Sequence, residues 1–343
     1  MYVTRPLSHY LRSPESLSLP PEGPNSGYLV MQDEESETTT CFGLCKKRYL
    51  IDLPFPQNKN LTVRYSSGGG DNRHVSLHDA TFIPVLNQPL SLNRYYAIKP
   101  HGSHKGEAYA CSREEDMTPL APDGFPPIFL RSSGWTILSK PTTTYELGEA
   151  LGIKAALRAR LPNFNSPIVV GKWYCPFMFI KDGNLKDQMK QSLFYEMTLE
   201  QSWERIFACE NNISSQGNSV TVEAEVQREV VFVGGREAVW DENRVSDGVV
   251  WFRGSGGVEE VNIGLSSLIV DRMKWEEERR GWVREENRQV KVKRTEEFGG
   301  IGGGWSKFGC YVLVERFVLK RMDGSVVLTY DFKHTHVIRS KWE

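Results

Sequence analysis

The sequence lacks long apolar runs and an excess of charge of one sign. No apolar run in its 343 residues approaches the roughly 20 residues that a helix needs to cross a bilayer, so we predict no transmembrane segment and a soluble chain. Lysine and arginine number 42, and aspartate and glutamate number 43. This balance argues against a protein that is concentrated on nucleic acid by its overall charge.

Cysteines are few, and they do not form a recognisable framework. Six are scattered along the chain, and Cys41 and Cys45 have the wrong separation for a CxxC pair. The N-terminal segment lacks the apolar core of a secretory signal, and its prolines oppose the amphipathic helix of a plastid transit peptide. We therefore expect free thiols in a reducing compartment, with the cytoplasm favoured, the nucleus as an alternative and the plastid disfavoured.

The motifs of common enzymes and nucleotide-binding proteins are also absent. The glycine-rich stretch from Phe298 to Trp305 has neither the GK[ST] ending of a P-loop nor the spacing of a dinucleotide-binding turn. No GxSxG elbow and no HExxH helix occurs. The sequence thus indicates no cofactor, and it favours a protein that is not an enzyme.

Two similar strand patterns are present instead. Val226–Val230 leads through Gly234-Gly235 to a second apolar run, and Val314–Val318 leads through Asp323-Gly324 to another. Glycine and aspartate tolerate the positive φ angles of two-residue hairpin turns. We predict two β-hairpins, within residues 220–251 and 310–342.

Three segments show helical patterns. Thr143–Leu161 and a segment from Thr198 begin with capping boxes, and Leu265–Trp282 has apolar residues seven apart. The charged run from Asp271 to Arg280 is expected to face solvent. The predicted fold is α+β: a mainly antiparallel sheet of hairpins with about three amphipathic helices packed on it.

Composition suggests four segments. Residues 1–26 are expected to form an extended arm and residues 27–116 a β-rich subdomain. Residues 117–127 are rich in proline and form the best candidate for a junction. Residues 128–343 would then form an α+β subdomain that holds both hairpins.

The turn at Asp323 and Gly324 predicts the register of the second hairpin, because one fixed turn sets every later pair. With Met322 opposite Ser325, the predicted pairs are Arg316 with Asp331, Phe317 with Tyr330, Leu313 with His334 and Tyr311 with His336.

This register brings candidate catalytic residues together. His334 and His336 would point to the same side of the hairpin, with Glu315 diagonal to His334. An acid and an imidazole in one apolar environment perturb each other's pKa values, as in catalytic sites. The alternative, which we favour, is that both histidines are structural.

Metal binding and ligand stacking are two further alternatives. His101 and His104 could complete a metal site with His334 and His336, although no spacing requires one. Aromatic side chains that could stack on sugars or apolar ligands are Trp173, Tyr174, Trp251 and Trp305. For most of these aromatic residues, packing in the core is the more frequent role.

The chain also resembles a known family. Segments at Met1 (MYVTRPLS), Leu53 (LPFPQNKNLTVRYSS), Arg94 (RYYAIKPHG), Val169 (VVGKWYCPFMFIKDG) and the ending YDFKHTH to KWE are similar to the plant family catalogued as domain of unknown function 1262. Some catalogues label such proteins insecticidal crystal toxin domains. The resemblance implies no established activity, cofactor or catalytic residue.

We therefore expect a non-enzymatic binding or interaction protein with an unidentified protein partner, in stress or defence responses. One alternative is an enzyme of unrecognised type with a histidine-centred site, with or without a metal. The other is a carbohydrate-binding module, which requires exposed tryptophans on a sheet face or in a groove.

Overall fold

A computed structural model describes residues 1–37, 39–40, 45–46, 49–50, 53–67, 74–109, 135–140, 146–211, 218–241, 245, 247–255, 261–285, 287–300 and 304–343. The chain divides into two compact units. Unit 1 comprises Met1–Gly152 with Trp173–Tyr195, and unit 2 comprises Ile153–Lys172 with Glu196–Glu343. The proline-rich segment 117–127 lies outside the described residues, and the four-segment division remains a prediction.

Unit 1 contains a five-stranded antiparallel sheet, in the order β5-β9-β6-β7-β8, and a parallel pair formed by β1 and β2. Its elements are β1 (Tyr2–Pro6), α1 (Leu7–Arg12), η1 (Pro14–Ser18), β2 (Gly27–Met31), η2 (Glu34–Ser36), β3 (Thr39–Thr40), β4 (Cys45–Lys46), β5 (Tyr49–Leu50), β6 (Asn60–Ser67), β7 (His74–Pro84), η4 (Leu90–Leu92), β8 (Tyr95–Ile98), β9 (Trp135–Lys140), η6 (Phe177–Phe179), β12 (Ile180–Lys181) and α3 (Leu185–Gln191). Residues 1–26, predicted to form an extended arm, include β1 and α1, and Met1 and Tyr2 are completely buried.

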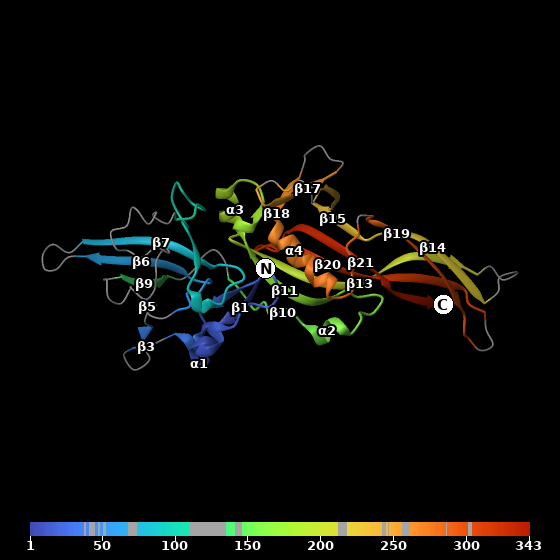
Figure 1. Ribbon diagram of the computed structural model, residues 1–343, viewed down its shortest axis with the longest axis horizontal. Coiled ribbons are helices and arrows are strands. Elements are labelled where there is room, and N and C mark those ends of the chain that lie inside the picture. Colours follow the sequence, from blue (N-terminus) through green and yellow to red (C-terminus); the bar gives the residue numbers. More distant parts are fainter. Residues whose placement is uncertain are drawn as a thin grey trace. The chain divides into compact units, whose positions relative to one another are not determined.

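Unit 2 is built on a sheet with the strand order β18-β17-β16-β15-β21-β20-β13 (Figure 1). Its elements are α2 (Ala155–Ala159), β14 (Ser219–Gln227), β15 (Glu229–Val233), β16 (Arg236–Trp240), β17 (Val249–Gly254), β18 (Asn262–Ser266), α4 (Ser267–Glu278), β19 (Gln289–Glu297), β20 (Lys307–Arg321) and β21 (Val326–Trp342). Three strands have residues in both units: β10 (Gly152–Ile153), β11 (Ile168–Pro176) and β13 (Phe194–Glu210). The pair β14–β19 forms a separate antiparallel ribbon.

At each of the two predicted turns, a pair of antiparallel strands is joined. β15 and β16 are joined by Gly234 and Gly235, which both have positive φ. β20 and β21 are joined by a turn in which the backbone N–H of Ser325 donates to Asp323 Oδ1 over 2.8 Å and Gly324 has φ +86°. The residues before Glu229 belong to β14, which pairs with β19 and not with the first hairpin.

The predicted register of the β20–β21 hairpin is confirmed from Leu313 to Leu319 and is wrong on both sides of this stretch. Beside the turn, Lys320 pairs with Val326, because the register shifts between Leu319 and Lys320. The pairs Arg316–Asp331, Phe317–Tyr330 and Leu313–His334 form as expected. Tyr311 pairs with Arg339 and not with His336, because the register shifts between Val312 and Leu313. Irregularities in the ladder change the pairing, and the turn residues do not specify where they occur.

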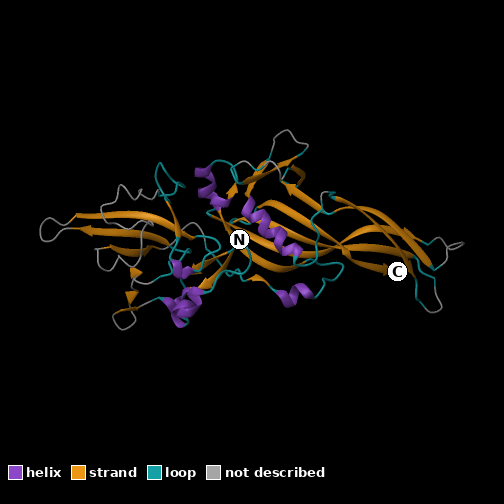
Figure 2. Ribbon diagram, in the orientation of Figure 1, coloured by secondary structure: helices purple, strands orange, loops and turns teal. Residues whose placement is uncertain are grey.

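The predicted α+β fold is wrong, because strands dominate the chain (Figure 2). In the described part of the chain the α-helices α1 to α4 are 6, 5, 7 and 12 residues long. The helix expected after Thr198 is the long strand β13. Leu199 and Trp203 are four residues apart, and that spacing puts two side chains on one face of a strand as well as of a helix. Here Leu199, Gln201 and Trp203 are all buried, with period two.

Of the other two predicted helices, one is short and one is present. In Thr143–Leu161, residues 143–145 lie outside the described residues, Gly152 takes φ +80°, and only Ala155–Ala159 is α-helical. Within Leu265–Trp282 the helix α4 forms over Ser267–Glu278. None of the described helices is long and apolar enough to span a membrane.

Candidate functional site

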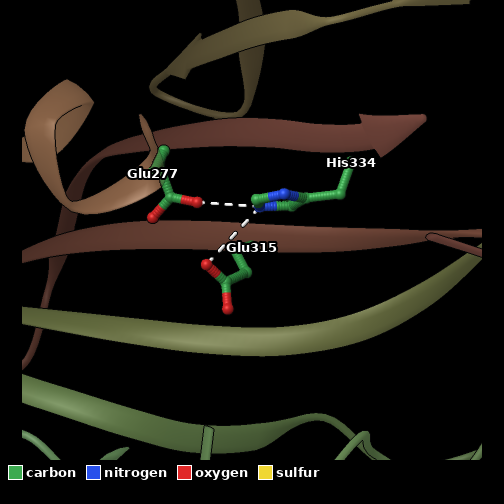
Figure 3. Close-up of side chains that lie close together, drawn as sticks. All are labelled: Glu277, Glu315 and His334. Atoms are coloured by element: carbon green, nitrogen blue, oxygen red, sulfur yellow. Dashed lines mark hydrogen bonds and ion pairs between the residues drawn. The ribbon is translucent and has the colours of Figure 1, made fainter. Parts of the chain in front are cut away.

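Three polar side chains meet inside unit 2, from α4, β20 and β21 (Figure 3). His334 Nε2 lies 2.9 Å from Glu277 Oε2 and 3.5 Å from Glu315 Oε2. One potential ligand atom from each residue falls within 4.8 Å of the others, so the group has the spacing of a metal site. All three side chains have an exposed fraction of 0%. We call Glu277, Glu315 and His334 the buried triad.

Arg158 of α2 already supplies a cation to the triad. Its Nε lies 3.0 Å from Glu315 Oε1, its Nη2 hydrogen-bonds Glu315 Oε2, and Nη2 is 3.3 Å from Glu277 Oε1. Gln201 Nε2 donates to Glu315 Oε1 over 2.7 Å. Both carboxylate oxygens of Glu315 are therefore occupied, and a metal ion at the triad would have to displace the guanidinium from them.

The environments of the two triad carboxyl groups push their pKa values apart. Burial, reinforced by the negative charge of Glu315, raises the pKa of Glu277 to about 8. Burial alone would also raise the pKa of Glu315, but the hydrogen bonds from Arg158 and His334 outweigh it and hold that pKa well below its usual range. For His334, burial lowers the pKa, and the hydrogen bonds to Glu277 and Glu315 more than compensate and raise it to about 9. Glu315 is therefore the ionised carboxyl group of the triad, whereas Glu277 and His334 hold their protons, which leaves Glu277 neutral and His334 positively charged near neutral pH.

Part of the charged run of α4 is buried, contrary to the prediction that the run faces solvent, while Asp271, Glu278 and Arg279 are exposed. Arg272, Lys274, Glu276 and Glu277 are all buried. Arg272 Nη1 lies 2.6 Å from Glu276 Oε1, and Arg158 Nη1 lies 3.3 Å from Glu276 Oε2. Buried charges are tolerated when they are paired and hydrogen-bonded. The helix pattern located α4 correctly, but it could not show that another segment supplied these partners.

Four histidines were predicted to act together, and of these His334 and His336 lie close to each other in unit 2. Their ring centroids are 5.5 Å apart, and His336 is exposed at its position beyond the register shift. Burial and the nearby charge of His334 lower the pKa of His336. His101 and His104 are exposed residues of unit 1, where His104 Nδ1 lies 2.9 Å from Glu107 Oε2. A shared metal site remains a prediction.

The four aromatic candidates differ in exposure. Trp173, Tyr174 and Trp305 are buried, and the hydroxyl of Tyr174 accepts a hydrogen bond from the backbone N–H of Gly148 over 3.0 Å. Trp251 is 37% exposed on β17, opposite Gly264 of β18. Among these four, Trp251 alone could offer a ring face to a ligand.

A groove with a cavity volume of about 230 Å³ lies on β13, β20 and β21. Its charged lining residues are Arg205, Glu210, Lys307, Lys341 and Glu343. Unlike the residues of the buried triad, these side chains are accessible to solvent: Lys341 is half-buried, and the other four are exposed. We call this feature the β20 groove.

Comparison with known proteins identifies part of the chain. Residues 22–121 match the model of the family described as "Protein of unknown function (DUF1262)". The predicted family resemblance is confirmed for this segment. No curated protein matches the sequence. The solved structure described as "Crystal structure of Cry35Ab1" matches with 12% identity and a TM-score of 0.35, covering 84% of this chain and 90% of that one.

The DUF1262 match and the site fall on different parts of the sequence. The matched segment belongs to unit 1, whereas the buried triad and the β20 groove are formed by residues of unit 2. Sequence reasoning found His334 and Glu315 by register. It missed Glu277 and Arg158, because no local pattern shows that α2 and α4 supply side chains to the same hairpin face.

Proposed function

We propose that the protein is a non-enzymatic binding or interaction protein, in which the buried triad is a structural connection between α4 and the β20–β21 hairpin. The observation that carries this proposal is the complete burial of Glu277, Glu315 and His334 together with the occupation of Glu315 by Arg158. A general acid or base has to reach a proton on its substrate, directly or through one water. The same groups are well placed to hold α4 against the sheet.

Native mass spectrometry and elemental analysis of the purified protein, beside His334→Ala, test this proposal. We expect a wild-type mass without a stoichiometric metal or small molecule at the triad, and a variant that unfolds at lower denaturant concentration. A metal or retained molecule that is present in the wild type and lost in a folded His334→Ala variant would contradict the proposal. It would support the histidine-centred enzyme instead.

A second candidate function is carbohydrate binding, favoured by Trp251. Its side chain is exposed on a sheet face, beside exposed Arg253 on the same strand and Asn262 on the next. An aromatic face flanked by hydrogen-bonding side chains is suited to a sugar ring. Titration with soluble glucose oligomers, followed by tryptophan fluorescence, should show saturation that Trp251→Ala abolishes. An equal fluorescence response from the wild type and from Trp251→Ala would argue against carbohydrate binding at Trp251.

The biological setting rests on the family resemblance alone. We extend the proposal to a protein partner and to a role in stress or defence responses. Transcript abundance before and after pathogen challenge tests this extension, and unchanged levels would argue against it.

A further inference from the structure

The β20 groove has a wall that is fixed by close packing. A Cβ atom on Gly309 would lie 2.8 Å from the ring of Tyr311, so only glycine lets this ring lie over β20. The ring of Phe164 packs against Tyr311 with centroids 4.8 Å apart. These contacts hold the Tyr311 side chain at the groove.

Arg205 is the one arginine among the residues that line the groove, and no described carboxylate forms an ion pair with it. It is exposed on β13, and within the described residues its guanidinium has no hydrogen bond or ion pair. A guanidinium presents a planar set of donors that matches the two oxygens of a carboxylate or phosphate. An unpaired arginine in a concave site therefore favours an anionic ligand.

The two lysines of the groove are only weakly paired. Lys307 Nζ lies 3.7 Å from Glu210 Oε1, with side chains 63% and 69% exposed. Lys341 pairs with Glu343, with side chains 43% and 52% exposed. Exposed ion pairs of this kind contribute little to stability, so an incoming anion can replace the glutamates at modest cost. The three cations outnumber the two acids that line the groove.

We propose that the β20 groove binds a small multivalent anion, carried by a phosphorylated or polycarboxylated molecule, through Arg205, Lys307 and Lys341. This assignment rests on the proposed binding function and names its ligand class. The volume of about 230 Å³ is below the roughly 300–1,000 Å³ of pockets for drug-sized ligands. The size therefore favours a compact anion over a macromolecule.

Calorimetric titration of the full chain with pyrophosphate and with citrate tests the assignment and distinguishes the two sources of negative charge. We expect saturable binding of at least one probe, weakened about tenfold by Arg205→Ala through loss of charge-assisted hydrogen bonds. Arg236→Ala is the matched control, because Arg236 is also an exposed strand arginine and lies outside the groove. Its affinity should equal that of the wild type.

A second set of variants should change the binding affinity in the opposite direction. Glu210→Gln and Glu343→Gln release Lys307 and Lys341, and each should tighten binding about threefold while leaving the fold intact. Glu223→Gln is the control, since Glu223 pairs with Lys291 and Lys293 on the β14–β19 ribbon. A purely structural role of the groove residues would not make affinity rise in one set of variants and fall in the other.

The outcomes separate the site assignment from the proposed function. No saturable binding of either anion, or equal losses in Arg205→Ala and Arg236→Ala, would overturn the assignment and leave the binding function open to another ligand. Saturable binding with conversion of the probe, lost in Arg205→Ala, would support the site and overturn the non-enzymatic function.

Discussion

Glu277 Oε2 of α4 lies 2.9 Å from His334 Nε2 of β21, and this contact joins the last turn of the helix to the hairpin. Glu315 and Arg158 extend the contact to β20 and α2. The four elements α2, α4, β20 and β21 thus depend on one set of buried charges. Buried charge clusters are costly to break, because each partner that remains is left without its compensating charge.

Glu315→Gln should destabilise unit 2. The substitution removes the charge that faces Arg158 and leaves a buried guanidinium underpaired, for which we expect a loss of about 3–5 kcal/mol in the free energy of unfolding. Urea denaturation followed by circular dichroism measures this loss. The control is Glu223→Gln, at an exposed and paired glutamate, and it should leave the free energy of unfolding almost unchanged. Similar small effects in both variants would contradict a structural role of the triad.

Stability should fall as the pH rises from about 6.5 to 9, the window set by the ordinary and the raised pKa of His334. A raised folded-state pKa means that the native state holds the proton more tightly, so its stabilisation is complete below pH 6.5 and lost near pH 9. The loss is about 3 kcal/mol at most. Glu277, with its pKa raised to about 8, changes stability in the same direction. Urea midpoints measured across this range should decline less steeply in His334→Gln than in the wild type.

Acidification should destabilise the protein through His336. Its lowered pKa means that the native state disfavours the proton, so the stabilisation is present above pH 6.5 and is lost as the pH falls below it. The groups that face this ring are His334 and the backbone and charge of Arg280. His336→Gln should reduce the loss of stability between pH 6.5 and 5. An unchanged profile would show that His336 titrates without coupling to folding.

Gly281→Ala should cost more stability than Gly324→Ala. Both glycines have positive φ, which costs a non-glycine residue of order 1 kcal/mol or more. At Gly281 a Cβ atom would also lie 3.1 Å from His336 Nε2, whereas at Gly324 nothing lies within 4 Å. We expect an additional loss of about 1 kcal/mol at Gly281. Equal losses in thermal unfolding would show that the His336 ring moves freely away.

Local sequence signals predicted the parts of the site that lie close to a turn. Asp323 and Gly324 impose a tight turn, and from it the pairing of Leu313 with His334 and the approach of Glu315 to His334 follow. The same reasoning was wrong at Tyr311, because the irregularity after Val312 adds residues to one strand. Periodicity was also insufficient at Leu199 and Trp203, whose spacing fits both a helix and a strand.

By itself, the sequence determined the positions of the turns, the position of α4 and the register of Leu313 to Leu319, because these depend on residues close together in the chain. Tertiary structure decided that Glu276 and Glu277 of α4 are buried, since their partner Arg158 comes from a helix more than a hundred residues earlier. It also decided which cations remain accessible, and Arg205 is distinguished from other arginines by the groove formed by three strands. Burial and pairing of charge depend on contacts between distant segments, which no local pattern contains.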